Sequence, residues 1–407
     1  MTLTSFRGRS SLSSSDPARR GISLKQGRDA PVRRRHHPWI YSQAIAEAAA
    51  GASPADLLPV RSVDGTVIGW GLYSPDSLIA VRMVSFTSEA PPEDWIDRRI
   101  RGAYSLRGRL ALDSDAFRLV NSEGDFLPGC IVDVYGDTVV VSPHTRAIES
   151  MLDRIISSIS VLLPGTRVYL KRDEHFARVE KLALPAGYLI GTGDGKAVIR
   201  EGGVNIIVDF ARGQKTGFYL DQRVNRSIIA GCSTTRSMLN LFSYSGAIAL
   251  RAAAAGALRV TSVDSSRAAL DLAAESAALN GGLDAGMLSW VQADVFSFLQ
   301  APGTWDVVIA DPPPFARRRV ELEGALKGYL SLFQQCLRIL NPGGMAFLFS
   351  CSGAVDRPAF QQLVAEAALR SGRTVRFLRE LHADADHPVA ASHPEGEYLK
   401  GWMVHAE

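Results

Sequence analysis

Two short segments carry the residues that could do chemistry. Asp311, Pro312 and Pro313 follow the apolar run WDVVIA, and Cys351 follows the apolar run AFLFS one predicted helix later. Because neighbouring parallel strands end at the same edge of a sheet, the acid and the thiol are expected to lie close together. A thiolate can add to an electron-poor ring while a carboxyl group holds that ring. The pattern predicts covalent chemistry on a flat base held out of its stack.

Methylation of cytosine at C5 is the reaction that needs these groups. C5 is a poor nucleophile until a thiolate adds at C6, after which C5 can attack a methyl sulfonium and loss of its proton expels the thiol. We predict Cys351 as the thiol, because its Ser/Gly turn is an exposed, polar position where a lowered pKa is expected. The alternative is a small buried hydrophobe, the role expected of Cys336 in the helical run LFQQCLRIL.

The acid and its neighbours are predicted to hold the base. Asp311 would hydrogen-bond cytosine N3 and the exocyclic amine, so Cys351 and Asp311 are the predicted catalytic residues. Pro312 and Pro313 would fix the backbone beside the base. Phe315 would stack on the base, or else belong to the core. The histidines have no metal-ligand spacing, so no metal is predicted.

A cofactor pocket is predicted at the ends of the preceding strands. The turn Ser243-Tyr244-Ser245-Gly246 follows the run SMLNLF but has one glycine, so the GxGxxG fingerprint of a dinucleotide site is missing. S-adenosylmethionine fits better, with Asp264 for its ribose and Asp294 for its adenine, although each acid could equally cap a helix. The predicted cofactor-binding residues are Gln222, Phe242, Tyr244, Ser245, Gly246, Asp264, Ser265, Asp294, Val295 and Asp311.

The segment GQKTGFYLDQRVNRSI lies just before this pocket. Lys215, Arg223 and Arg226 could reach the cofactor carboxylate or an RNA phosphate. An ordinary amphipathic helix with exposed basic residues is the alternative. The predicted substrate-binding residues are Arg33, Arg34, Arg35, Trp39, Lys215, Arg223, Pro312, Pro313 and Phe315.

The positions of these residues require a modular α/β chain. Strand and helix patterns alternate over residues 213–407, which predicts a parallel, doubly wound sheet with ligands at the carboxyl ends of its strands. Residues 93–212 read as a central α+β domain, with one helix from Glu93 to about Leu112 and another near Ile148 to Leu163. Residues 21–92 read as a small all-β barrel, and residues 1–20 as a disordered basic tail.

The barrel carries the basic character of the chain. Residues 1–40 hold nine Lys or Arg against two acids, in a chain whose net charge is +3. The cluster Arg33-Arg34-Arg35 beside Trp39 and Tyr41 could contact phosphates and stack on bases, although at least one of the two aromatic residues is expected to fill the core.

Composition limits the class of protein. Its 407 residues suit two or three domains, and no apolar run approaches the roughly 20 residues of a transmembrane helix, so no membrane role is expected. Four cysteines without CxxC spacing indicate a reducing compartment, the cytoplasm.

The chain resembles the bacterial ribosomal RNA large subunit methyltransferase I family, from about residue 22 onward. The matching stretches are RRHHPWIYSQAI, GLYSPDSLIAVRM, EGDFLPGCIVDVYGD, GQKTGFYLDQR, LNLFSYSGAIAL, VTSVDSSRAALDLAAESAALN, DVVIADPPPFA, GGMAFLFSCSG and ADHPVAASHPEGEYLKG. The resemblance implies a PUA barrel, a central domain and a class I (Rossmann-like) methyltransferase domain. It also implies methylation of cytosine C5 in 23S rRNA, free or in an assembling subunit, with Cys351 as nucleophile, and a possible homodimer. Pro314 stands where the family usually has lysine, and the segment RDEHFARVEKLALPAG also departs from the family pattern.

Three rival functions remain open from the residues. Diproline motifs also serve methyltransferases that modify guanine N7 or adenine N6, which need no thiol. A non-catalytic RNA-binding or ribosome-assembly role would leave the aligned acids and Cys351 without a purpose. A nicotinamide oxidoreductase is disfavoured by the missing GxGxxG motif.

Overall fold

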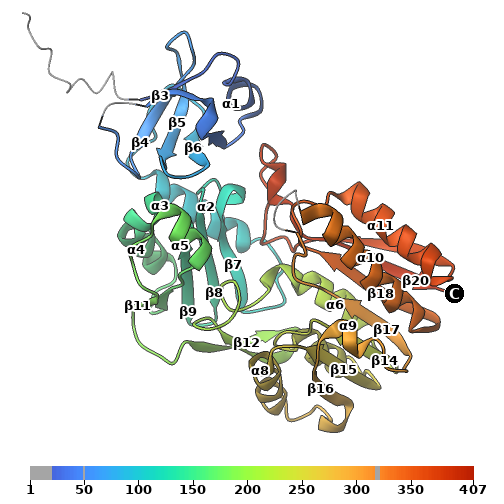
Figure 1. The fold of residues 1–407 in the computed structure, drawn as a ribbon. Helices are drawn as coiled ribbons and strands as arrows, with labels where there is room; N and C mark the ends of the chain where they lie inside the picture. Colours follow the sequence, from blue (N-terminus) through green and yellow to red (C-terminus); the bar gives the residue numbers. More distant parts are fainter. Residues whose placement is uncertain (1–20, 49–50, 317–320) are drawn as a thin grey trace, which may run out of the picture. The chain divides into compact units, whose positions relative to one another are not determined.

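The computed structural model describes residues 21–48, 51–316 and 321–407 (Figure 1). The tail predicted for residues 1–20 lies outside the described residues. Internal contacts divide the chain into two compact units. The first runs up to Ile96 and includes His144–Asp153 and Glu174–Ala183, and the second contains Asp97–Pro143, Arg154–Asp173 and Leu184–Glu407. The central segment is thus shared between two units, and the division into three domains stays a prediction.

The first unit is built on a six-stranded sheet of order β2-β6-β5-β4-β1-β3. Its strands are β1 (Ile22–Leu24), β2 (Trp39–Tyr41), β3 (Ile45–Ala48), β4 (Leu57–Arg61), β5 (Val67–Tyr73) and β6 (Ile79–Ser85). The Asp64-Gly65 turn joins β4 to β5: Gly65 has φ +83°, and Asp64 Oδ1 accepts a hydrogen bond of 3.0 Å from Thr66 N. Three short helices complete this unit, α1 (Ala30–Arg35), α3 (Arg146–Ser150) and α5 (Glu174–Glu180).

The aromatic residues of β2 lie differently from the prediction. Ile40 is buried in the core of the first unit, whereas Trp39 and Tyr41 on either side of it are only half-buried. The expectation that one of the two aromatic residues fills the core was therefore wrong. In a strand, successive side chains point to opposite faces, so the buried Ile40 turns both aromatic neighbours away from the core.

The second unit begins with a five-stranded sheet of order β11-β10-β9-β8-β7. Its strands are β7 (Ala116–Asn121), β8 (Cys130–Tyr135), β9 (Thr138–Pro143), β10 (Arg167–Leu170) and β11 (Gly187–Ile190), and the hairpin β12 (Lys196–Glu201) and β13 (Val204–Asp209) follows. Every residue of β8 and β9 is buried, as their β-branched runs lead one to expect. Helix α2 (Trp95–Arg107) precedes the sheet, and the helix predicted near 148–163 breaks at Met151 into α3 and α4 (Leu152–Leu162).

A seven-stranded sheet of order β16-β15-β14-β17-β18-β20-β19 forms the rest of the second unit. The strands are β14 (Ser237–Leu241), β15 (Arg259–Asp264), β16 (Leu288–Gln292), β17 (Trp305–Ala310), β18 (Leu340–Ser350), β19 (Val375–Leu381) and β20 (Lys400–Ala406). The order reverses between β14 and β17, which confirms the doubly wound α/β fold. The sheet is not wholly parallel, however, because β20 runs antiparallel between β18 and β19.

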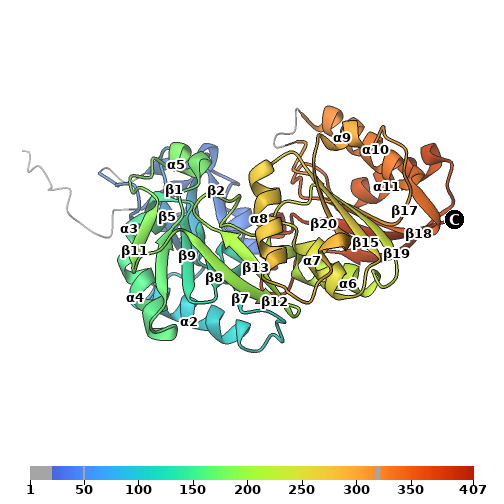
Figure 2. The ribbon, with the colours of Figure 1, turned by 90° about the horizontal axis from the view of Figure 1, so that it is seen from below.

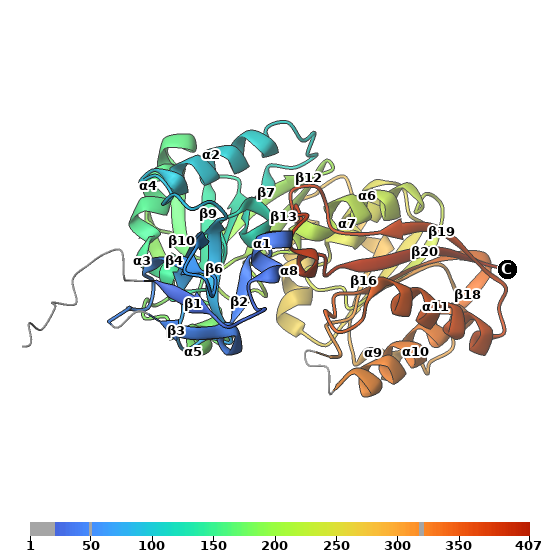
Figure 3. The same ribbon diagram turned by 90° about the horizontal axis from the view of Figure 1, so that it is seen from above.

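Helices cover both faces of this sheet. Figures 2 and 3 show α6 (Arg223–Gly231) and α7 (Ala247–Ala254) on one side, with α10 (Leu322–Arg338) and α11 (Arg357–Ser371) on the other. Ile229 and Ala252 belong to the hydrophobic core under α6 and α7. Phe333 and Cys336 belong to the separate core under α10 and α11. Cys336 is fully buried, so its predicted core position is confirmed. Two further helices follow β15 and β16, α8 (Arg267–Ala278) and α9 (Val295–Phe298).

A buried carboxylate holds the β12–β13 hairpin to α6 and α7. Glu201 is fully buried, and its oxygens accept hydrogen bonds from Arg226 at 2.6 Å and from Arg251 at 3.3 Å. Breaking such a pair leaves an unpaired buried charge, which costs about 3–5 kcal/mol. The ion pairs therefore fix the start of α6, which carries part of the site described next.

Among the described residues, no helix is both long and apolar enough to span a bilayer.

Candidate catalytic site

The parallel pairing of β17 with β18 brings the predicted acid and thiol together. Ile309 is opposite Phe347 and Ala310 is opposite Leu348, so Asp311 and Cys351 leave the sheet at the same edge. Cys351 Sγ lies 3.9 Å from the carbonyl oxygen of Pro312. The two groups predicted to act together are thus neighbours.

Asp311 is half-buried, and its carboxyl group is held by an amide. Gln222 Nε2 donates to Asp311 Oδ2 at 2.7 Å. Burial, and next the charge of Asp221, raise the pKa of Asp311 to about 6, although the hydrogen bond from Gln222 and the charges of Lys215 and Arg226 oppose this shift. A carboxyl group with such a pKa can donate as well as accept near neutral pH.

The thiol is in a less favourable state than the sequence suggested. Burial, and next the Asp311 carboxylate, raise the pKa of Cys351 to about 11, while Lys215 acts in the opposite direction. The expected lowering of this pKa is therefore wrong for the free protein, because the turn after β18 is half-buried rather than exposed. At neutral pH the Cys351 thiol is therefore protonated, whereas Asp311 is mostly ionised and only a minor fraction of it is neutral.

Lys215 supplies positive charge near both groups. Its Nζ atom lies 2.7 Å from Asp221 Oδ2 and 4.2 Å from the ring centre of Tyr219. Tyr398 donates a hydrogen bond to the same carboxylate oxygen. Burial disfavours the charge on Asp221, but Lys215 and His387 hold the pKa of Asp221 well below its usual value.

Sequence reasoning missed Asp221, Asn225 and Tyr398 as parts of this site. Asp221 and Asn225 lie beside Gln222 in the chain, which was a usable local signal. Tyr398 comes from the segment before β20, 177 positions after Asp221, and no local pattern marks it.

The cofactor turn is built from left-handed residues. Phe242, Tyr244 and Gly246 have φ of +58°, +46° and +74°. A Cβ atom on Gly246 would lie 2.7 Å from Ala273 Cβ and 2.8 Å from the ring of Trp290, so only glycine fits. Phe242 packs against the core formed by α10 and α11, and Ser245 is buried.

The acids at the strand ends support this turn and cap helices. Asp264 accepts hydrogen bonds from Tyr244 N at 2.8 Å and from Ser266 N at 2.9 Å. Asp294 accepts from Ser297 N at 2.9 Å and caps α9, the alternative left open for it. Ser265 is exposed and Val295 is buried.

The residues present fit S-adenosylmethionine. Ser243 Oγ is buried in the cofactor turn and has no hydrogen-bond partner among the residues that the structure describes, so a ligand carboxylate could accept from it. Asp264 is half-buried at the end of β15, where a ribose is expected. The individual cofactor contacts stay predictions.

The predicted substrate residues divide into exposed and buried groups. Lys215 and Pro313 are exposed, Pro312 is buried, and half-buried Phe315 packs on Tyr329 with ring centres 4.5 Å apart. Phe315 thus joins the edge of the core and keeps part of its ring open.

Arg223 was wrongly predicted to contact the substrate. It is buried, and its guanidinium lies 2.7 Å from Asp384 and 2.8 Å from Asp386. These two carboxylates neutralise the positive charge of Arg223. Arg226 is likewise buried and paired with Glu201, so both guanidinium groups form ion pairs inside the fold and are not exposed to RNA phosphate.

The remaining predicted substrate residues lie in the first unit. Arg33, Arg34 and Arg35 occupy the last turn of α1 and are exposed, and Trp39 is half-buried. Arg33 makes an ion pair of 3.3 Å with Asp29. The Arg33 side chain is exposed, so a phosphate could replace Asp29 as its partner at little cost.

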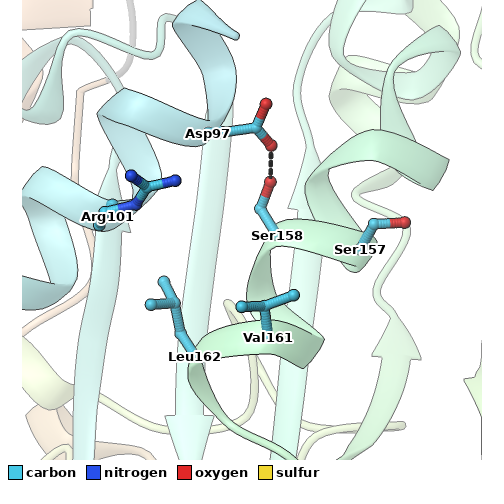
Figure 4. Close-up of a pocket in the computed structure, with 6 residues that line it drawn as sticks. All are labelled: Asp97, Arg101, Ser157, Ser158, Val161 and Leu162. Atoms are coloured by element: carbon cyan, nitrogen blue, oxygen red, sulfur yellow. Dashed lines mark hydrogen bonds between the residues drawn. The ribbon is translucent and has the colours of Figure 1, made fainter.

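A separate cavity of about 180 Å³ lies between α2 and α4. Figure 4 shows Asp97 on α2 bonded to Ser158 on α4, with Val161 and Leu162 completing the wall. None of the predicted site residues lines this cavity. No cluster of His, Cys, Asp or Glu suited to a metal ion occurs within the described part of the chain.

Comparison with known proteins agrees with this geometry. A model of S-adenosylmethionine-dependent methyltransferases matches residues 184–395, and one of PUA-like domains matches residues 22–86. Proteins called ribosomal RNA large subunit methyltransferase I are similar along nearly their whole length. The one from Shewanella denitrificans is 39% identical, and the match covers 94% of this chain and 98% of that protein. The one from Klebsiella pneumoniae is 36% identical, and the match covers 94% of this chain and 97% of that protein.

Solved structures show the same fold. A methyltransferase crystallised with S-adenosylhomocysteine has a TM-score of 0.81 at 22% identity, covering 95% of this chain and all of that one. A methyltransferase from Streptococcus mutans has a TM-score of 0.80 at 22% identity, with the same coverage. By its identity to the curated relatives and the extent of the match, the chain belongs to the ribosomal RNA large subunit methyltransferase I family of S-adenosylmethionine-dependent methyltransferases.

Proposed function

We propose that the protein methylates C5 of a cytosine in 23S rRNA, with Cys351 as the nucleophile and Asp311 as the group that holds the base. The observation that carries this proposal is the pairing of a thiol and a carboxyl group of raised pKa at adjacent strand ends. The names of the relatives support an rRNA substrate. The RNA would be free or part of an assembling large subunit in the cytoplasm.

The residues divide the work between them. Cys351 adds as a thiolate to C6, which places electron density on C5 and on N3. Asp311 donates its proton to N3 and accepts from the exocyclic amine, so that the added charge is neutralised. The turn at 243–246 would hold S-adenosylmethionine, which would supply the methyl group as a sulfonium. When a base takes the C5 proton, the C6–S bond breaks, Cys351 leaves as a thiolate, and N3 returns its proton to the Asp311 carboxylate.

Lys215 supports the thiolate form of the nucleophile. Its charge opposes the raised pKa of Cys351, and the ion pair with Asp221 fixes its position. We include Lys215 in the catalytic site rather than among phosphate contacts, because Asp221 already holds its ammonium group.

Nucleoside analysis tests the proposal. Purified protein is incubated with unmodified 23S rRNA and S-adenosylmethionine, and the methylated nucleoside is identified by mass spectrometry. We expect 5-methylcytidine from the wild type and none from Cys351→Ala, since the covalent adduct cannot form without the thiol. Cys232→Ala is the matched control, because Cys232 ends α6 away from the strand ends and should remain active. A methylated purine, or activity that survives Cys351→Ala, would make ring-nitrogen or amino methylation the better assignment.

A further inference from the structure

A buried chain of hydrogen bonds leads to the carboxyl group of Asp311. Asn225 Nδ2 donates to Gln222 Oε1 at 2.6 Å, and Gln222 Nε2 donates to Asp311 Oδ2 at 2.7 Å. Asn225 Nδ2 also donates to the carbonyl oxygen of His382 at 3.1 Å. The relative exposure of Gln222 is 5% and that of Asn225 is 1%, so water cannot readily replace these contacts.

The direction of this chain is fixed by the backbone. A carbonyl oxygen can only accept, so the carbonyl of His382 requires the nitrogen of the Asn225 amide to face it. The same nitrogen also donates to the Gln222 side chain, so the Gln222 atom that faces it must be the amide oxygen. The nitrogen of Gln222 must consequently face Asp311, and Gln222 cannot rotate its amide without losing both hydrogen bonds.

The fixed direction makes the two oxygens of Asp311 unequal. Oδ2 already accepts from Gln222, so the proton of the neutral acid is better placed on Oδ1. The neutral acid then offers one donor and one acceptor in a set order. Cytosine offers an acceptor at N3 beside a donor at its exocyclic amine, whereas uracil offers a donor at N3 beside an acceptor at O4.

We propose that Gln222 and Asn225 are positioning residues that orient Asp311 to accept cytosine and reject uracil. This inference rests on the proposed function, because Cys351 must bind C6 for the base to have one orientation. With the ring so oriented, uracil would need a proton on Oδ2, where Gln222 already donates. Uracil would otherwise place two acceptors or two donors opposite each other in a buried site, and the free-energy cost of these unmade hydrogen bonds excludes uracil.

A choice between two bases provides the test. Short RNAs carrying either cytidine or uridine at the methylated position are compared by kcat/KM, with the product identified as 5-methylcytidine or 5-methyluridine. For Gln222→Leu, we expect the cytidine-to-uridine ratio to fall by about tenfold or more, as for the loss of one oriented hydrogen bond. Asn225→Ala frees the Gln222 amide to rotate and should lower the ratio in the same direction.

Controls separate orientation of the acid from other effects. Gln335→Leu removes an amide on the exposed side of α10, where Gln335 bonds Gln300, and should leave the ratio unchanged. Gln222→Met keeps the approximate size of the side chain and has no hydrogen-bond donor, so it replaces Gln222→Leu if that variant does not fold. Where turnover is slow, the ratio of RNA affinities gives the same comparison.

The outcomes distinguish this inference from the proposed function. A wild type that makes no 5-methylcytidine overturns both. A wild type that makes it through Cys351, with variants whose base ratio is unchanged, overturns only the role of Gln222 and Asn225. Weaker S-adenosylmethionine binding without a change in the ratio would instead assign Gln222 to the cofactor.

Discussion

At the scale of single residues, the pKa values of Asp311 and Cys351 both lie above their ordinary values. The acid has the lower pKa, about 6, and the nucleophile the higher, about 11. The reaction needs the acid protonated and the thiol ionised, so only a small fraction of molecules is in the reactive form. Burial produces both shifts, because a half-buried site disfavours each charged form.

This order gives a specific pH profile. Between about pH 7 and pH 9, each unit of pH raises the thiolate fraction tenfold and lowers the fraction of neutral Asp311 tenfold, so log kcat/KM should be flat. In Asp311→Asn the acid no longer titrates, and kcat/KM should be lower but rise about tenfold per pH unit over the same range. Steady-state rates with saturating S-adenosylmethionine measure this. A wild-type profile that rises with unit slope would show that Asp311 acts as a carboxylate.

At the scale of elements, the turn between β14 and α7 is the most constrained segment of the site. Gly246 is the N-cap of α7 with φ +74°, and a Cβ added to it would meet Ala273 of α8 and Trp290 of β16. Any side chain there would push these elements apart. The turn also depends on Asp264, which accepts the Tyr244 amide.

Gly246→Ala should therefore lower both stability and cofactor affinity. The positive φ and the clash with Trp290 together cost about 1–3 kcal/mol, measured as the free energy of unfolding in urea. Calorimetry should show weaker S-adenosylmethionine binding. Gly281→Ala is the matched control, since no atom lies within 4 Å of its added Cβ and its φ is not in the left-handed region. Equal effects of the two substitutions would contradict a special role of the turn.

At the scale of the whole molecule, the predicted RNA contacts and the proposed chemistry lie in different compact units. The exposed arginines of α1 belong to the first unit, and Asp311 and Cys351 belong to the second. Contacts to phosphate carry no sequence information but contribute affinity that depends on salt. Loss of the arginines should therefore change the binding of RNA and leave cofactor binding intact.

The variant Arg33→Gln/Arg34→Gln/Arg35→Gln tests this separation. We expect a higher KM for RNA and a salt dependence of log affinity that is shallower by roughly two to three. The affinity for S-adenosylmethionine should be unchanged. Arg259→Gln is the control, because exposed Arg259 begins β15 at the sheet edge opposite the site. An unchanged salt dependence would show that α1 does not contact phosphate.

The sequence by itself determined the strand ends that carry Asp311 and Cys351, the α/β fold of residues 213–407 and the cofactor class. Alternating apolar runs and turn residues are local signals, and parallel neighbours necessarily end together. Only the tertiary structure decided the pKa values of Asp311 and Cys351, and which basic residues are exposed and which are buried in ion pairs. Arg223 reads like an RNA contact until Asp384 and Asp386, far along the chain, are seen to bury it.

The same limit applies to the groups that orient the acid. Gln222 was predicted to bind the cofactor, and its contact with Asp311 depends on Asn225 and on the carbonyl of His382. Tyr398 reaches Asp221 because β20 inserts antiparallel between β18 and β19, a pairing that periodicity does not specify. Hydrogen-bond direction and desolvation arise from contacts between distant segments, so they exist only once the chain has folded.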